Sequence, residues 1–214
     1  MWLVLAHDGD VTARELVRSW PDATRLVSPA DVCRDGWSLR MTARGSDVAC
    51  AVAPAADLAE VAGVLTRLSV LDVRDVPAVH HEDRPYAAAE LGAFLLAWLD
   101  ACPVPVVNRP RPGCLNGPPW SRELWAAAAA EAGLPVATAP SSVAENLTVV
   151  GRQVLGEADP LLAAAVLRLA ELAGTFLLGV TVDEKSRFVA ATARPRLDSA
   201  EQRVLAETLG WTSC

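Results

Sequence analysis

Two guanidinium groups and a carboxamide stand close together in the turn Asn108-Arg109-Pro110-Arg111. Residues 104–108 form a short apolar run that is typical of a buried strand, and the prolines that follow it limit the freedom of the turn. A planar guanidinium recognises a carboxylate or a phosphate through paired N–H donors. The pattern therefore indicates either a rigid structural turn or a pocket for an anionic ligand.

Histidines occur at two further places where chemistry could be expected. His7 and Asp8 follow the first apolar run, at the carboxyl end of a strand, which is where ligands bind in open α/β sheets. An ordinary loop histidine is the other interpretation. The run HHED at 80–83 offers four metal-ligand types, but neighbours on an extended loop point to opposite sides, so a solvated loop is favoured over a metal site. Nucleophile-elbow and glycine-rich phosphate motifs are missing.

Composition excludes several classes of protein. The chain has 214 residues, of which 52% are hydrophobic, so it can bury a core without a disulfide or a metal. A net charge of −7 argues against a nucleic-acid partner, which requires a basic surface. The five cysteines show no C-x-x-C spacing, so neither a zinc site nor a disulfide framework is expected. With no long apolar stretch and no basic start, we expect a cytoplasmic protein that does not contact a membrane.

Strand and helix patterns alternate over the first hundred residues. This alternation predicts a small parallel or mixed sheet with flanking helices. Expected strands lie at 2–7, 25–27, 63–67 and 104–108, and expected helices at 13–20, capped by Thr12, and 86–100. A hairpin is expected from arms at 38–43 and 47–52 with its turn at 44–46. Residues 57–68 are ambiguous, with a strand expected at their end.

The second half predicts a smaller α+β unit. A helix capped by Ser121 is expected at 122–132, followed by a linker, two strands, a helix at 160–173, strands at 176–182 and 187–193, and a helix at 199–209. The expected organisation is an α/β domain at 1–110, a loop, helix and linker at 111–142, and an α+β unit at 143–214.

Several short motifs follow one another in a recognisable order. They are VLTR at 64–67, NRP at 108–110, LNG at 115–117, EAGLP at 131–135 and LTVVGRQV at 147–154. In this order they resemble RimK-like and peptide-modifying ATP-grasp ligases. The resemblance implies a pre-ATP-grasp-like sheet in the first half and a reduced ATP-grasp-like α+β subdomain in the second. It also implies ligand contacts from a set of five residues: Arg67, Asn108, Arg109, Arg111 and Asn116.

The chain departs from this family where nucleotide and metal would be held. The loop lysine of the family corresponds to Pro119, and the single lysine of the chain, Lys185, lies in a polar turn. The magnesium positions correspond to Thr181, Ala190 and Thr192, which are poor ligands for a hard cation. Few residues separate EAGLP from LTVVGRQV, so a complete adenine-binding subdomain, of about a hundred residues, does not fit between them. We therefore expect no metal and no cofactor.

Three functions remain open. The first is a non-catalytic ATP-grasp-like protein that binds a full-length ligase, a precursor peptide or a second copy of itself. Its partner surface is expected at Trp120 and Trp125, on an alanine-rich helix that the lost subdomain would have covered, although the C-terminal hairpin and helix could cover it instead. The second is an enzyme that uses the open α/β crevice or completes a ligase site in trans. The third is a small-molecule binding module.

Overall fold

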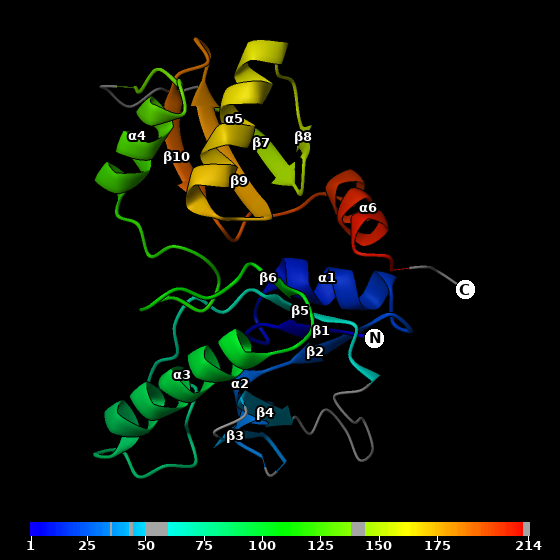
Figure 1. The fold of residues 1–214 in the computed structure, drawn as a ribbon, viewed down its shortest axis with the longest axis vertical. Coiled ribbons are helices and arrows are strands. Elements are labelled where there is room, and N and C mark those ends of the chain that lie inside the picture. Colours follow the sequence, from blue (N-terminus) through cyan, green and yellow to red (C-terminus); the bar gives the residue numbers. More distant parts are fainter. Residues whose placement is uncertain (35, 43–44, 50–59, 138–143, 212–214) are drawn as a thin grey trace. The chain divides into compact units, whose positions relative to one another are not determined.

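The computed structural model describes residues 1–34, 36–42, 45–49, 60–137 and 144–211. Its contacts divide the chain into two compact units, Met1–Asn116 and Gly117–Trp211. Figure 1 shows the elements of each unit. The predicted α/β class, with a parallel sheet and a separate antiparallel sheet, is confirmed. None of the described helices combines the length and the hydrophobicity that a membrane span requires.

A four-stranded parallel sheet forms the core of the first unit, in the order β2-β1-β5-β6. Among the described residues of this unit, three helices and one antiparallel hairpin, β3–β4, accompany the sheet. The elements are β1 (Trp2–Leu5), α1 (Val11–Ser19), β2 (Thr24–Val27), α2 (Pro29–Val32), β3 (Ser38–Thr42), β4 (Gly45–Ala49), β5 (Gly63–Thr66), α3 (Arg84–Ala101) and β6 (Val106–Val107). All four residues of β1 are buried, as are those of β5, because both strands lie inside the sheet.

Two details of the first unit differ from the sequence prediction. Asp10, not Thr12, caps α1, because its carboxylate accepts a hydrogen bond from the Ala13 N–H, whereas Thr12 is buried inside the helix. In the hairpin, Gly45 and Ser46 were expected in the turn but belong to β4, where they pair with Thr42 and Met41. The last part of the expected second arm, residues 50–52, lies outside the described residues.

A second, antiparallel sheet forms the second unit, in the order β10-β9-β7-β8. The elements are α4 (Arg122–Glu131), β7 (Ala144–Val150), β8 (Gln153–Leu155), α5 (Pro160–Ala173), β9 (Leu177–Asp183), β10 (Phe188–Thr192) and α6 (Ser199–Thr208). These bounds agree with the predicted ones to within about two residues at each end, apart from those of the strands β7 and β8, for which no separate bounds were predicted.

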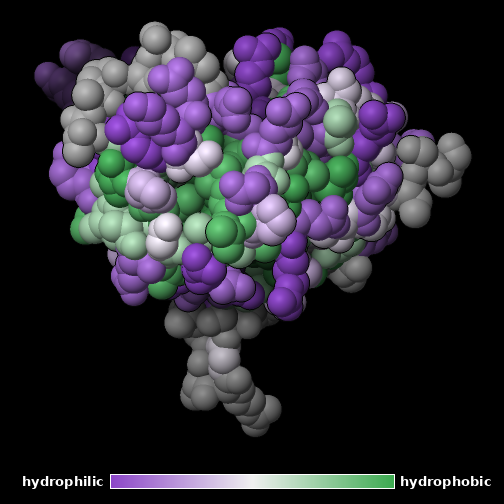
Figure 2. All heavy atoms as spheres, turned by 90° about the horizontal axis from the view of Figure 1, so that it is seen from above, coloured by the Kyte–Doolittle hydropathy of each residue, from purple (hydrophilic) through white to green (hydrophobic). Residues whose placement is uncertain are grey.

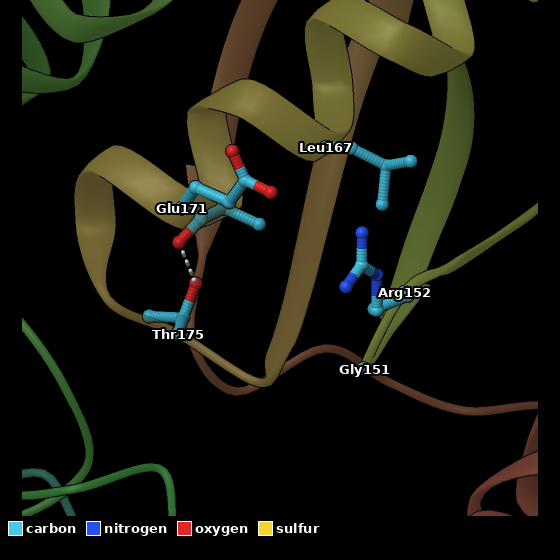
Figure 3. A pocket seen from close by; sticks show the side chains of 6 residues that line it. Gly151, Arg152, Leu167, Glu171 and Thr175 are labelled. Atoms are coloured by element: carbon cyan, nitrogen blue, oxygen red, sulfur yellow. Dashed lines mark hydrogen bonds between the residues drawn. The ribbon is translucent and has the colours of Figure 1, made fainter.

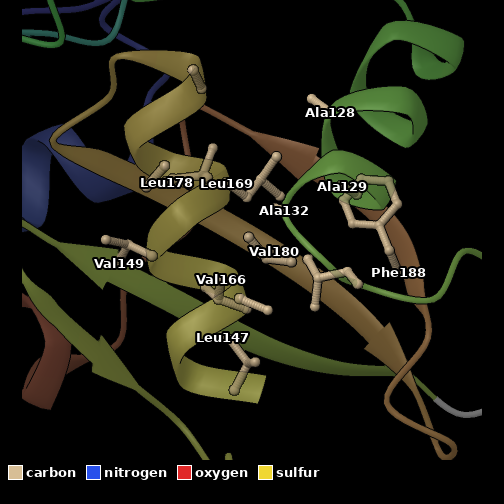
Figure 4. Close-up of a cluster of buried hydrophobic side chains, with 14 of the residues drawn as sticks. Ala128, Ala129, Ala132, Leu147, Val149, Val166, Leu169, Leu178, Val180 and Phe188 are labelled. Carbon is tan, nitrogen blue, oxygen red and sulfur yellow. The ribbon is translucent and has the colours of Figure 1, made fainter. Parts of the chain in front are cut away.

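The core of the second unit lies between the sheet and the helices α4 and α5. Figure 4 shows Leu147, Val149 and Val180 of the sheet facing Val166 and Leu169 of α5. Alternate residues of β7 and β9 supply this apolar face, as the two-residue period of a strand requires.

A segment of the same unit pairs with the outer edge of β10 at its first residue, Phe188. Phe188 donates its N–H to the Pro135 carbonyl at 2.6 Å, and its own carbonyl accepts the N–H of Ala137 at 2.9 Å. Residues 135–137 therefore run beside β10 as a short parallel bridge. The three-residue strand β8 is the opposite edge of the same sheet.

Candidate functional site

The loop that follows β6 presents two arginines to solvent. Arg109 and Arg111 are both exposed, and within the described ranges neither has an acidic side chain within 4.0 Å. The loop is held by backbone hydrogen bonds: Arg111 and Cys114 exchange N–H groups and carbonyls at 2.9 and 2.8 Å. Leu115 donates its N–H to the Ser69 carbonyl at 2.8 Å. A rigid backbone thus carries two exposed guanidinium groups.

Two buried amides belong to the same loop. Asn108 directly follows β6 and is buried, and the peptide bond that precedes it is cis. Asn116 is only 2% exposed, and its Oδ1 accepts a hydrogen bond from the Cys114 thiol at 3.2 Å. The Nδ2 group of Asn116 is buried and has no hydrogen-bond partner among the described residues. A buried donor without a partner costs about 1–3 kcal/mol, so this amide is an unsatisfied polar group inside the loop.

Arg67 lies at the end of β5, beside the strand that precedes this loop. The side chain is 4% exposed, and its Nε donates to Asp10 Oδ2 at 3.0 Å. Asp10 Oδ1 at the same time caps α1. The structure therefore places Arg67 at the same end of the sheet as Asn108, but in a buried ion pair that links β5 to the start of α1.

Trp120 and Trp125 lie in the second unit. Their rings pack edge to face, with centroids 4.8 Å apart. Trp125 is 7% exposed and belongs to the core with Ala128 and Ala129, and Trp120 packs against that core while remaining partly exposed. The apolar face of α4 is thus covered by β10 and α5 of its own unit. This is the intramolecular alternative that the sequence analysis named beside a partner surface.

The positions that correspond to the magnesium ligands of ATP-grasp ligases carry neutral side chains. Thr181 and Ala190 are cross-strand neighbours, and the Thr181 hydroxyl donates to Asn146 Oδ1 at 2.9 Å. The Thr192 hydroxyl accepts the Arg194 N–H at 3.2 Å. No group of three or more metal-ligating side chains occurs in the described part of the chain. Two hydroxyls and a methyl group do not fit a hard cation that prefers carboxylates.

A pair at the end of β1 was not selected by sequence reasoning. His7 Nδ1 lies 3.1 Å from Asp75 Oδ1, so the imidazole is held at the carboxyl end of the strand. Nearby, Asp72 is paired with Arg74 at 2.6 Å, and the hydrogen bonds from Arg74 lower the pKa of Asp72 to about 2. His7 and Asp8 could be selected from the sequence because they follow a predicted strand, but no local pattern predicts that residues 72–75 lie beside His7. The rings of His80 and His81 contact each other in a tilted arrangement, with centroids 4.4 Å apart, and both residues are exposed.

One small cavity lies in the second unit, between α5 and the turn from β7 to β8. It measures about 70 Å³ and is lined by Gly151, Arg152, Leu167, Ala170, Glu171 and Thr175. In Figure 3 the guanidinium of Arg152 lies below Leu167, and the Thr175 hydroxyl is hydrogen-bonded to the backbone of α5. Pockets for drug-sized ligands measure roughly 300–1,000 Å³, so this cavity is too small for a nucleotide.

Solved structures with the same fold are peptide-modifying ligases. The ATP-grasp ligase PsnB, complexed with a minimal precursor, superposes with a TM-score of 0.71 at 12% identity over 97% of each chain. The macrocyclase MdnC from Microcystis aeruginosa, bound to its precursor peptide MdnA, gives 0.69 at 10% identity over 98% of this chain and 99% of MdnC. A RiPP-associated ATP-grasp ligase from Chryseobacterium gregarium, in complex with ADP and a leader and core peptide, gives 0.68 at 11% identity over 98% and 96% of the two chains.

The protein therefore has an ATP-grasp-like fold, as the order of its motifs predicted. Family models and curated proteins gave no match.

Proposed function

We propose that this protein is a non-catalytic, ATP-grasp-like binding subunit that contacts a peptide partner through the loop after β6. One observation carries the proposal: Arg109 and Arg111 are exposed without an acidic partner among the described residues, and the buried Nδ2 group of Asn116 stands in the same loop. Exposed guanidinium groups of this kind recognise carboxylates. The peptide-bound ligases that share the fold support a peptide as the source of those carboxylates.

The non-catalytic part of the proposal rests on the residues at the nucleotide and metal positions. Pro119 stands where the family resemblance places a lysine, and Thr181, Ala190 and Thr192 stand at the metal positions. Only residues 132–143 lie between α4 and β7. These features support a chain that binds no magnesium nucleotide and acts beside a complete ligase, or beside a second copy of itself.

Calorimetric titration with MgATP tests the non-catalytic part. We expect no saturable heat up to millimolar nucleotide. Saturable binding in the micromolar range would contradict it and would favour the enzyme hypothesis, for which the His7–Asp75 pair is the most specific support, since a held imidazole is a common general base.

Fluorescence anisotropy with a labelled acidic peptide tests the binding part. The probe is a peptide with the central sequence Glu-Val-Val-Glu in a Gly/Ser background, acetylated and amidated to remove its terminal charges. Arg109→Ala should weaken binding by about two- to fivefold, the effect of one exposed charge pair, without lowering the melting temperature. The matched control is Arg18→Ala, which removes an exposed arginine from the last turn of α1. Equal losses in both variants would show that only net charge matters.

The second unit exposes apolar side chains, and the partner protein packs against them in this proposal. The first turn of α5 carries Leu161, which is 83% exposed, and Leu124 of α4 and Leu172 of α5 are also exposed. Seen from above, the molecule shows a group of apolar side chains framed by polar ones (Figure 2). A leucine side chain that is exposed to this extent supports a protein contact, so Leu161 is the partner residue that we propose in addition to Trp120.

A further inference from the structure

Three kinds of side chain follow one another along one edge of the parallel sheet. We call the loops after β1, β5 and β6 the carboxyl edge, since each follows the carboxyl end of its strand. The loop after β6 is basic, with Arg109 and Arg111. The loop after β5 exposes Val70 and Val73, at 60% and 43%. Because β5 lies between β1 and β6, these two valines follow the strand that separates the other two loops.

Contacts hold residues 69–75 of the loop after β5 at both ends of this segment. At one end the Ser69 carbonyl accepts the N–H of Leu115, which belongs to the loop after β6. At the other end Asp75 Oδ1 lies 3.1 Å from His7 Nδ1, in the loop after β1. The exposed valines therefore lie on a segment that is tied to the basic loop on one side and to the loop after β1 on the other.

The end of the carboxyl edge at β1 is acidic. Four carboxylates gather there, Asp8, Asp10, Asp72 and Asp75, against two arginines, Arg67 and Arg74. Asp8 is exposed, and within the described ranges no cation lies within 4.0 Å of its carboxylate. The loop after β6 has the opposite balance, since residues 108–116 include two arginines and no acid. The carboxyl edge thus carries acids beside β1, the two exposed valines after β5, and two arginines after β6.

We propose that the carboxyl edge binds an extended peptide segment that carries an acidic and a basic side chain on either side of apolar residues. The acidic side chain pairs with Arg109 or Arg111, the apolar residues cover Val70 and Val73, and the basic side chain lies beside Asp8. This inference rests on the proposed function, because it specifies which peptides the same site accepts. Neighbouring strands are about 4.8 Å apart, so β1 and β6 are roughly 10 Å apart. An extended chain covers that distance in about three residues.

Four peptides of the same length, which differ only in the two residues that flank the valines, test this charge order. The probes carry the central sequences Glu-Val-Val-Lys, Lys-Val-Val-Glu, Glu-Val-Val-Glu and Gln-Val-Val-Gln, labelled and blocked as above, and the readout is the dissociation constant from anisotropy. One of the two mixed-charge peptides should bind about two- to fivefold more tightly than the all-acidic peptide, which reflects one additional exposed charge pair. The uncharged peptide should bind most weakly.

Reversal of one charge gives the sharper test. Asp8→Lys should remove the preference for the mixed-charge peptide and make Glu-Val-Val-Glu the tighter ligand, while its melting temperature stays unchanged because Asp8 is exposed. The matched control is Asp22→Lys, an exposed acid that precedes β2 and therefore lies at the opposite edge of the sheet. The control should keep the original order of affinities.

The outcomes separate this inference from the proposed function. If mixed-charge and acidic peptides bind equally and Asp8→Lys changes nothing, the charge order is wrong, but a loss in Arg109→Ala would still support a peptide site. If no peptide binds saturably, both are overturned. A switch of preference in Asp22→Lys as well as in Asp8→Lys would also overturn the inference, because the effect would then be one of net charge.

Discussion

The indole ring of Trp2 lies directly against Gly63, its partner across the parallel pair β1–β5. A Cβ atom at position 63 would come within 2.5 Å of two carbon atoms of the ring, Cη2 and Cζ3. Real Cβ contacts of this kind do not occur, so a side chain at position 63 displaces the ring or separates the strands. Trp2 is almost fully buried, so the ring has little room to move.

Gly63→Ala should therefore destabilise the first unit by about 1–3 kcal/mol, the usual cost of an overpacked core. Urea denaturation followed by tryptophan fluorescence measures the change. The control is Gly92→Ala in α3, where a Cβ meets nothing within 4 Å and alanine favours the helix by up to about 1 kcal/mol. Unchanged stability in Gly63→Ala would show that Trp2 can adopt another rotamer.

Arg67→Ala should also reduce stability, because it leaves Asp10 without its buried partner. Loss of one member of a buried ion pair costs about 3–5 kcal/mol, although Asp10 keeps some solvent access, so the lower end is expected. Arg74→Ala removes an arginine from a solvent-exposed pair and should leave stability nearly unchanged. Thermal denaturation measures both. A stable Arg67→Ala variant that binds peptide poorly would instead assign Arg67 to the ligand.

Asp183 should make the second unit sensitive to acid. Its side chain is fully buried and accepts hydrogen bonds from the Arg187 side chain at 2.8 Å and from the backbone N–H groups of Lys185 and Arg187. The hydrogen bond from the Arg187 side chain lowers the pKa of Asp183 below its usual value. A lowered folded-state pKa means that the stabilisation is complete above the unfolded-state pKa and is lost as the pH falls through the folded-state value.

Melting temperatures of the natural chain and of Asp183→Asn should therefore differ most at neutral pH. The gap should close as the pH falls below the ordinary range of an aspartate, because the natural chain loses the ionised carboxylate that the variant never had. Glu184→Gln, which changes an exposed acid in the same turn, should leave the pH profile unchanged. A gap of constant size at all pH values would contradict the assignment of this acid sensitivity to Asp183.

Leu161→Ser should weaken any association of two copies while leaving the fold intact. A leucine that is 83% exposed contributes little to the core, so the melting temperature should stay within about 1 °C of the original. Light scattering over a dilution series gives the oligomeric state. Val11→Ser, at an exposed apolar position of the first unit, is the control. A chain that is monomeric at all concentrations would leave a different protein as the partner of this surface.

Local patterns were enough to predict most of the elements. The apolar run of β1, the helix that ends before Pro103 and the helix capped by Ser121 each carry their signals within a few residues. The cap of α1 was missed because Asp10 and Thr12 both suit that position, and only the Ala13 hydrogen bond distinguishes them.

The candidate site was only partly predictable, because its contacts join distant parts of the chain. The loop after β6 could be recognised from its Asn-Arg-Pro motif, but the backbone hydrogen bond that joins it to Ser69 could not be predicted. The pairing of Asp75 with His7 and that of Arg67 with Asp10 bring together residues more than fifty positions apart. Such pairs depend on strand order, which no local pattern contains. The burial of Trp125 likewise follows from how β10 and α5 pack on α4.

The segment 135–137 that runs beside β10 has a consequence for self-assembly. Open strand edges allow sheets of different molecules to join, and a sheet with two open edges can grow without limit. Here Phe188, the first residue of β10, is already paired with residues 135–137 through both its N–H and its carbonyl, so another molecule cannot pair with the strand edge at that residue. The opposite edge, β8, is a strand of three residues, which gives another chain few backbone groups to pair with. Strand pairing between molecules is thus blocked at the start of one edge and limited by the short length of the other.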